Sequence, residues 1–147
     1  MHTPPRQSRL RTGRISIPGQ VYHLTFVTRS RRPFFNDFRI ARAAVCALRR
    51  AADRGDADTL AYVLMPDHLH WLMVLGPDRS LGKVVQAFKS ASARRVGQPI
   101  WQSGFHDHAL RTDEDCHAIA RYIVANPLRR GLVARVGDYP HWDAVWL

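Results

Sequence analysis

The stretch that most constrains this fold is residues 62–75, Tyr-Val-Leu-Met-Pro-Asp-His-Leu-His-Trp-Leu-Met-Val-Leu. Two apolar runs of strand-like composition flank a Pro-Asp pair, and so short a link joins two strands only as an antiparallel hairpin. Because successive side chains of a strand alternate between faces, we expect His68 and His70 on one side and Leu69 on the other. Two neighbouring imidazoles make half of a metal site, although polar positions of an ordinary amphipathic strand have the same pattern.

The segments around this hairpin predict an α+β domain. An antiparallel sheet of four to five strands with helices packed on it follows from their order. We expect a strand over 21–28, a helix from an N-cap at Asp37 to Arg54, strands over 59–65 and 68–75, a helix capped by Ser80, a strand over 105–110, and a third helix that starts at Thr112 and ends near Ala125 because of Pro127.

The charge of the chain points to a polyanion as its partner. There are 22 lysines and arginines against 12 acidic residues, which gives a net charge of +10. Lys83 and Lys89 are the only lysines, so most of the positive charge is arginine, whose planar group pairs well with phosphate. Glu114 is the only glutamate, which excludes a paired-glutamate site and makes glycosidase chemistry less favoured.

The two ends of the chain differ in composition from residues 20–133, which we expect to form the main domain. Residues 1–19 carry arginines, prolines and glycines without an apolar run, so they predict a basic arm on phosphates and neither a signal peptide nor a membrane span. Residues 134–147 are apolar enough to pack back on the domain. Cys46 and Cys116 lie far apart in helical patterns, which indicates reduced core residues of a cytoplasmic protein.

Tyr122 and Asn126 are one helical turn apart in the third predicted helix. Their spacing places a phenol and an amide on one helical face, where they could act as nucleophile and oxygen ligand. An apolar stripe that includes Tyr122, followed by Asn before Pro at a helix end, gives the same pattern without any function. Together with the His-x-His strand and the basic chain, however, the pair indicates nuclease chemistry.

Three blocks of the sequence resemble the signature blocks of the single-tyrosine HUH transposases, and in particular the REP-associated tyrosine transposases. The resemblance also takes in the opening strand Tyr-His-Leu-Thr and the Arg-Arg-Pro loop, so it covers nearly the whole chain from about Gly19. The blocks are Pro-Asp-His-Leu-His at 66–70, Trp-Gln-Ser-Gly-Phe-His-Asp-His-Ala-Leu-Arg at 101–111, and Tyr-Ile-Val-Ala-Asn-Pro-Leu-Arg-Arg-Gly-Leu-Val at 122–133.

This resemblance implies a ferredoxin-like or RRM-like HUH domain that cuts and rejoins single-stranded DNA at hairpin-forming repetitive palindromes. His68, His70 and Asn126 would hold Mg²⁺ or Mn²⁺, which would polarise the scissile phosphate. Tyr122 would attack and form a 5′-phosphotyrosine link with release of a 3′-hydroxyl. The expected partner is hairpin or single-stranded DNA rather than a membrane, for a monomer or homodimer in the bacterial cytoplasm at the nucleoid.

The remaining polar residues receive weaker assignments. His106 and His108 form a second His-x-His pair, a rival metal pair to which the resemblance gives less weight. Tyr22 and Tyr62 have no polar residue four positions later, and Tyr22, Tyr62 and Tyr139 are all expected in the core or in aromatic contacts. The residues expected to contact DNA are Arg11, Arg14, Arg29, Arg31, Arg32, Lys83, Lys89, Asp107, His108 and Arg111, with Asp107, His108 and Arg111 serving either DNA or the shell of the active site.

Two other classes of function stay open on sequence grounds. A small sheet with basic and aromatic residues suits an RRM-like nucleic-acid-binding module without catalysis, in which the two histidines and Tyr122 have no chemical role. A metal-dependent DNA hydrolase that uses His68, His70 and an aspartate is the third possibility. Metal binding separates the first class from the others, and a covalent DNA adduct separates the transposase from the hydrolase.

Overall fold

The computed structural model describes residues 16–111 and 114–145 of the 147-residue chain. Within them, one five-stranded sheet has the order β4-β1-β3-β2-β5, and every pairing is antiparallel. The first six main elements follow a β-α-β-β-α-β order, which is ferredoxin-like and confirms the predicted α+β class. They are β1 (Val21–Val27), α2 (Phe38–Asp53), β2 (Ala57–Met65), β3 (His68–Leu75), α3 (Leu81–Val96) and β4 (His106–Ala109).

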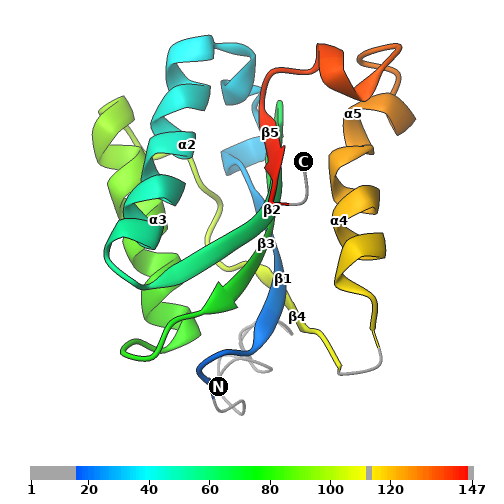
Figure 1. The fold of residues 1–147 in the computed structure, drawn as a ribbon. Coiled ribbons are helices and arrows are strands. Elements are labelled where there is room, and N and C mark those ends of the chain that lie inside the picture. Colours follow the sequence, from blue (N-terminus) through cyan, green and yellow to red (C-terminus); the bar gives the residue numbers. More distant parts are fainter. Residues whose placement is uncertain (1–15, 112–113, 146–147) are drawn as a thin grey trace, which may run out of the picture.

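Helices cover both faces of the sheet, as Figure 1 shows: α2 and α3 lie on one side and α4 (Cys116–Val124) on the other. A short helix, α5 (Asn126–Arg129), follows α4, and β5 (Trp142–Ala144) completes the sheet beside β2. Three single 3-10 turns, η1 to η3, span Arg29–Arg31, Phe34–Asn36 and Val136–Asp138. No helix in the described ranges is both long and apolar enough to cross a bilayer.

Alternation along the central strands divides the protein into two apolar layers. Leu24 and Phe26 of β1 and Trp71 of β3 are fully buried beneath α2 and α3, where Phe26 stacks on Phe88 at 5.5 Å between ring centroids. A second, smaller cluster includes Leu72 of β3 and lies beneath α4. The polar members of β1 and β3 therefore face the α4 side, where they line the edge of the smaller cluster.

The first two helices begin where their capping residues predict. The carboxylate of Asp37 accepts from the backbone N–H groups of Arg39 and Ile40, and the hydroxyl of Ser80 accepts from that of Lys83. Helix α3 is capped at its C-terminus by Gly97, whose φ of 90° is a left-handed conformation that glycine adopts without steric cost. Both predicted helices and the predicted hairpin are therefore present, with β2 starting two residues before position 59.

The predicted start of the third helix is wrong. The helix begins at Cys116, and the carboxylate of Asp115 caps it by accepting from the backbone N–H of His117 at 2.9 Å. Thr112, the expected cap, lies outside the described residues. Glu114 instead accepts from the backbone N–H of Arg111 at 2.7 Å, so this acid closes the preceding turn rather than the helix.

The predicted end of the third helix near Ala125 is confirmed within one residue, but Pro127 is followed by a further short helix. Helix α4 ends at Val124, and Pro127 occupies the first turn of α5, where its missing N–H has no partner to lose. Tyr122 and Asn126 consequently lie on two successive helices rather than on one continuous face. Their exposure differs sharply: the side chain of Tyr122 is 61% exposed, whereas Asn126 is 6% exposed.

The two ends of the described chain are attached to the domain. The backbone N–H of Gly19 donates to Leu75, and the hydroxyl of Ser16 accepts from Leu81, so the end of the predicted arm already contacts the hairpin and α3. The tail supplies β5, which pairs with β2 from position 61 to 63. Cys46 and Cys116 are both free thiols, half-buried rather than enclosed in the core.

Candidate active site

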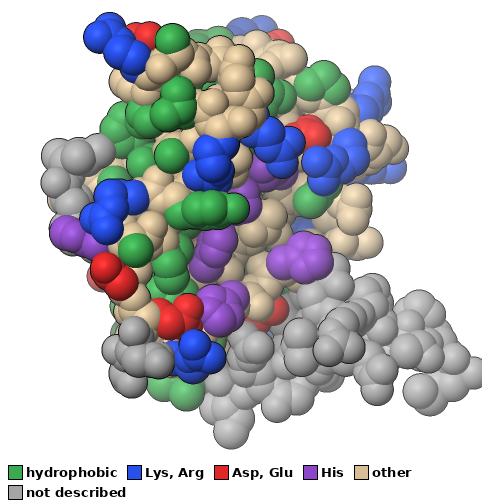
Figure 2. Space-filling view, turned by 90° about the vertical axis from the view of Figure 1, so that its right-hand side faces the viewer, with side chains coloured by type: hydrophobic (Ala, Val, Ile, Leu, Met, Phe, Trp, Pro, Cys, Tyr) green, Lys and Arg blue, Asp and Glu red, His purple; other side chains and the backbone are tan. Residues whose placement is uncertain are grey.

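His68 and His70 share the α4 face of the sheet, as their spacing predicts. Their ring centroids lie 5.0 Å apart with the rings nearly perpendicular, and His68 is only 4% exposed. His23 of β1 joins them, because the antiparallel register places its neighbour Thr25 directly opposite His70. Figure 2 shows this face, on which histidine side chains gather with Lys or Arg side chains beside them.

The inner nitrogens of the two central histidines are both engaged. Nδ1 of His68 lies 2.8 Å from an Asp67 carboxylate oxygen. Nδ1 of His70 lies 3.1 Å from Nε2 of His23 and 3.2 Å from the hydroxyl of Thr25. Such contacts fix the ring orientation and the tautomer, as the outer partners of metal-binding histidines do.

The outer nitrogens of the same rings are open to a ligand. Within the described residues, neither Nε2 atom has a hydrogen-bond partner, and neither belongs to the fully enclosed polar atoms without one. The side-chain amide of Asn126 likewise makes no hydrogen bond there and is not fully enclosed. Two imidazoles and an amide oxygen of this kind fit the nitrogen and oxygen ligands of a divalent transition metal.

The three histidines are held in their neutral form, which is the form that binds metals. Burial lowers the pKa of His70 to about 3, and the positive charges of His68, His23, Arg129 and Arg130 add to this effect. Burial also lowers the pKa of His68 and of His23. Because the neutral rings keep a lone pair, the site needs no deprotonation step before it takes a cation at neutral pH.

Asp67 links His68 to the arginine loop. One carboxylate oxygen faces His68, and the other lies 3.1 Å from Nε of Arg31. Ser30 and Arg31 both have a φ of 54°, a left-handed conformation that is uncommon for residues other than glycine. The backbone N–H of Thr28 donates to the Asp67 carbonyl and fastens the loop to the hairpin turn. Arg31, predicted to contact DNA, thus has a partner within the protein.

We expect Asp67→Asn to weaken Mn²⁺ binding about tenfold, because loss of a residue that orients a metal ligand costs on the order of ten- to a hundredfold in affinity. The amide keeps an oxygen acceptor for His68 but loses the charge that Arg31 and the imidazole N–H face. Isothermal titration calorimetry with Mn²⁺ measures the effect.

Asp78→Asn is the matched control, since Asp78 is exposed in the turn after β3, away from the histidines. It makes the same change of charge and should leave the affinity for Mn²⁺ unchanged. Equal affinities in the two variants would show that the Asp67 carboxylate does not orient His68.

The predicted nucleophile is exposed on α4, the helix that covers the sheet face with the histidines. Arg129 places its guanidinium 3.7 Å from the centroid of the Tyr122 ring and donates to the Tyr122 carbonyl at 2.6 Å. The same guanidinium is near enough to His70 to affect its charge state. The α4–α5 segment therefore brings an exposed phenol, an arginine and the buried Asn126 to the histidine face, which is an arrangement suited to chemistry on a phosphate.

The second His-x-His pair is not a comparable site. His106 and His108 are on the same sheet face as the others, since they pair with Thr25 and His23, but His108 is exposed and its Nε2 lies 3.1 Å from both carboxylate oxygens of Glu114. In the described part of the chain, no group of three or more His, Cys, Asp or Glu side chains is arranged to hold a metal. Among residues 16–111 and 114–145, no aspartate therefore joins His68 and His70 as the third ligand that the hydrolase alternative requires.

The residues predicted to contact DNA fall into separate regions, and their role stays a prediction. Arg29 and Arg32 are exposed beside the hairpin turn, whereas Arg11 and Arg14 lie outside the described residues. Lys83 and Lys89 belong to α3 on the opposite face of the sheet, and Lys89 donates to the carbonyls of Gln102 and Gly104.

Asp107 pairs with Leu24 and faces the α2–α3 side, so it is not part of the shell around the histidines. Arg111 is exposed at the end of β4, and its Nε lies 3.9 Å from Glu114. Contact with DNA stays a prediction for both residues. The sheet register excludes the alternative role in the active-site shell for Asp107.

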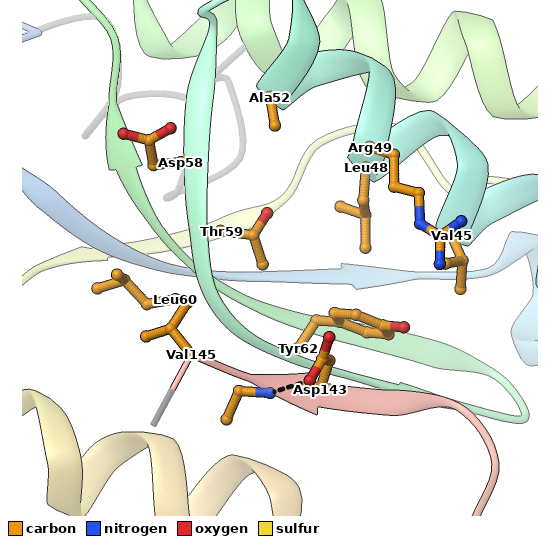
Figure 3. Close-up of a pocket in the computed structure, with 11 residues that line it drawn as sticks. Val45, Leu48, Arg49, Ala52, Asp58, Thr59, Leu60, Tyr62, Asp143 and Val145 are labelled. Atoms are coloured by element: carbon orange, nitrogen blue, oxygen red, sulfur yellow. Dashed lines mark hydrogen bonds between the residues drawn. The ribbon is translucent and has the colours of Figure 1, made fainter. Parts of the chain in front are cut away.

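A cavity of about 430 Å³ lies elsewhere, between α2 and the β2–β5 edge of the sheet. Figure 3 shows that Leu48 and Arg49 of α2, Tyr62 of β2 and Asp143 of β5 line it. It is on the α2 side, whereas the histidines are on the α4 side. The candidate site is therefore an open surface rather than this cavity, as expected for a site that takes a polymer.

Sequence reasoning missed three members of the site. His23 gives no local signal, because only the register of β1 against β3 brings it to His70. Asp67 and His68 are adjacent in the sequence, which is a signal for a contact between them, but the Pro-Asp pair predicts only a turn. The sequence also contains a signal for Arg129, since it follows Tyr122 by seven residues, which is about two helical turns.

Comparison with known proteins gives a consistent family. The sequence profile described as "Transposase IS200 like" matches residues 16–126. The chain is similar to the REP-associated tyrosine transposase of Escherichia coli K12, at 29% identity over 131 residues that cover 86% of this chain and 78% of the relative. It is also similar to a solved structure of a REP-associated tyrosine transposase bound to a REP hairpin, with a TM-score of 0.73, 27% identity, and coverage of 88% of this chain and 79% of that one.

Proposed function

Because this chain belongs to the IS200-like transposase family, we propose that it cuts and rejoins single-stranded DNA beside hairpin-forming palindromes through a covalent bond to Tyr122. The observation that carries the proposal is the position of the Tyr122 ring. It is exposed on α4, the helix that covers the sheet face carrying His68 and His70, and a guanidinium is stacked against it. A buried tyrosine could not reach a phosphate of a polymer.

The residues around Tyr122 divide the chemistry between them. A divalent cation, Mg²⁺ or Mn²⁺, held by His68, His70 and Asn126 would polarise the scissile phosphate and offset its charge. The phenol oxygen of Tyr122 attacks phosphorus and forms a new P–O bond while the bond to the 3′ oxygen breaks. The phenolic proton passes to solvent, and the departing oxygen takes up a proton to become a 3′-hydroxyl. The bond between Tyr122 and the 5′ phosphate conserves the energy of the broken phosphodiester. Another 3′-hydroxyl can therefore attack this bond and form a new DNA phosphodiester.

The DNA partner follows from charge and from the solved relative. That relative is bound to a REP hairpin, and the net charge of +10 on this chain suits a folded nucleic acid. Arg29 and Arg32 are exposed next to the hairpin turn, and Arg129 and Arg130 are exposed on α5. Phosphates that follow these two sets of arginines would pass across the histidine face.

The decisive experiment uses one DNA hairpin with single-stranded flanks, labelled in separate samples at its 5′ or 3′ end. With Mn²⁺ present, the 3′-terminal label should become attached to the protein, because Tyr122 retains the fragment that carries the new 5′ phosphate. The 5′-terminal label should be released on a fragment with a free 3′-hydroxyl. A blunt duplex of the same sequence is the control and should give no adduct.

Each alternative function has its own result in this experiment. Cleavage without a protein-linked label would show that water attacks and would favour a metal-dependent hydrolase. Tight binding of the hairpin without any cleavage would favour a nucleic-acid-binding module. Either result would overturn the proposed transposase chemistry.

A further inference from the structure

The contact between Arg129 and Tyr122 combines a stacking interaction with a hydrogen bond. The guanidinium carbon lies 3.7 Å from the centre of the phenol ring, and one terminal nitrogen donates to the Tyr122 carbonyl at 2.6 Å. Both side chains are exposed. A long arginine side chain loses much conformational freedom when it is held in this way, and exposed cation–π contacts are worth only about 0.5–1 kcal/mol. The arrangement therefore contributes little to stability.

The contact spans the junction between α4 and α5. Helix α4 ends at Val124, and Pro127 in the first turn of α5 cannot donate a hydrogen bond to the preceding turn. The backbone N–H of Arg129 donates to Ala125 at the junction, which keeps α5 close to the end of α4. Arg129 thus returns over the preceding helix and covers one face of the Tyr122 ring.

Arg129 is close enough to the Tyr122 ring that a phosphate approaching the phenol would also approach the guanidinium. It stacks on the Tyr122 ring, and α4 covers the sheet face that carries His68 and His70. A guanidinium carries five N–H donors in one plane, and only one of them is used by the Tyr122 carbonyl. The other donors are free to bind the oxygens of a phosphate that approaches the ring.

We propose that Arg129 is a catalytic residue of DNA cleavage, which holds the Tyr122 ring in position and donates hydrogen bonds to the phosphate that Tyr122 attacks. This inference rests on the proposed function. As the bond from Tyr122 to phosphorus forms and the bond to the 3′ oxygen breaks, negative charge grows on the two non-bridging oxygens. Donors that are already in place at those oxygens stabilise the transition state more than the ground state.

The test measures the single-turnover rate of adduct formation in the full chain with the labelled DNA hairpin. Arg129→Ala should slow the reaction about a hundredfold, because removal of one such donor costs on the order of 10²–10³ in rate. Affinity for the hairpin should fall far less than the rate. Arg129→Gln keeps a donor without the charge and should be as slow as the alanine variant, whereas Arg129→Lys keeps the charge and should recover part of the rate.

Arg121→Ala is the matched control, because Arg121 is an exposed arginine adjacent to Tyr122 on α4. It removes the same charge and should retain nearly the wild-type rate. A readout independent of activity is the NMR signal of a ring-labelled Tyr122, assigned with the Phe variant, which should shift in Arg129→Gln and not in Arg121→Ala.

Three results would overturn the inference. Equal rates in wild type and Arg129→Ala would show that the guanidinium does not act on the reaction. Full recovery by Arg129→Gln would indicate that only the hydrogen bond to the α4 carbonyl matters, which is a structural role. If wild type forms no adduct at all, the proposed function fails, and the catalytic role of Arg129 fails with it even where the ring signal still shifts.

Discussion

Tyr122→Phe is expected to abolish the covalent DNA adduct and strand cleavage while leaving the protein folded and able to bind its hairpin. The substitution removes a single oxygen from a ring that is 61% exposed, so no core contact is lost. The benzene ring still offers a face to the guanidinium of Arg129. The expected loss is complete because no other group on this surface would replace the attacking phenol oxygen.

The measurement is a denaturing gel of the reaction with 3′-labelled hairpin DNA, together with the dissociation constant for the same hairpin. Tyr139→Phe is the control, because the Tyr139 hydroxyl donates to the Leu64 carbonyl at 2.6 Å and burial raises its pKa to about 12. That variant should lose about 1 kcal/mol of stability for the missing hydrogen bond and still form the adduct. Residual cutting by Tyr122→Phe would mean that a water molecule or another residue attacks.

Loss of either central histidine is expected to produce the second large effect. The structure shows which substitution is informative: His68 is 4% exposed and bonded to Asp67, so alanine would leave a cavity and an unpaired carboxylate. Asparagine places its amide N–H near the position of Nδ1 and removes only the outer nitrogen. His68→Asn and His70→Asn should each weaken Mn²⁺ binding by at least about a hundredfold, since the loss of a direct ligand exceeds the loss of an orienting residue.

Calorimetry measures the affinity of each variant for Mn²⁺, and the adduct assay measures its cleavage rate. The two measurements should rank the variants in the same order. His106→Asn is the control, because His106 lies on the same face in β4 but is exposed. It should bind Mn²⁺ as wild type does and should form the adduct at a similar rate. If His68→Asn, His70→Asn and His106→Asn all retain full affinity, the cation is held elsewhere and the assignment of the two histidines as ligands is wrong.

Patterns between near neighbours in the sequence determined much of the fold. The period of two in β3 placed His68 and His70 on one face, and the caps at Asp37 and Ser80 fixed the starts of two helices. These predictions depend on strand alternation and on hydrogen bonds that span two or three residues, so the information is local. The predicted start of the third helix was wrong because three acids and a hydroxyl lie within four residues as candidate caps, and the hydrogen bond that Asp115 accepts identifies the actual cap.

The shell around the candidate site was decided by tertiary structure. His23 reaches His70 only through the pairing of β1 with β3, and Arg31 reaches Asp67 only because the loop folds over the hairpin turn. The stacking of Arg129 on Tyr122 depends on the way α5 follows α4. Strand register and the packing of helices sum many weak contacts between distant residues, which no short stretch of sequence contains. The sequence by itself therefore predicted which residues would carry the chemistry, and the tertiary structure decided which neighbours surround them.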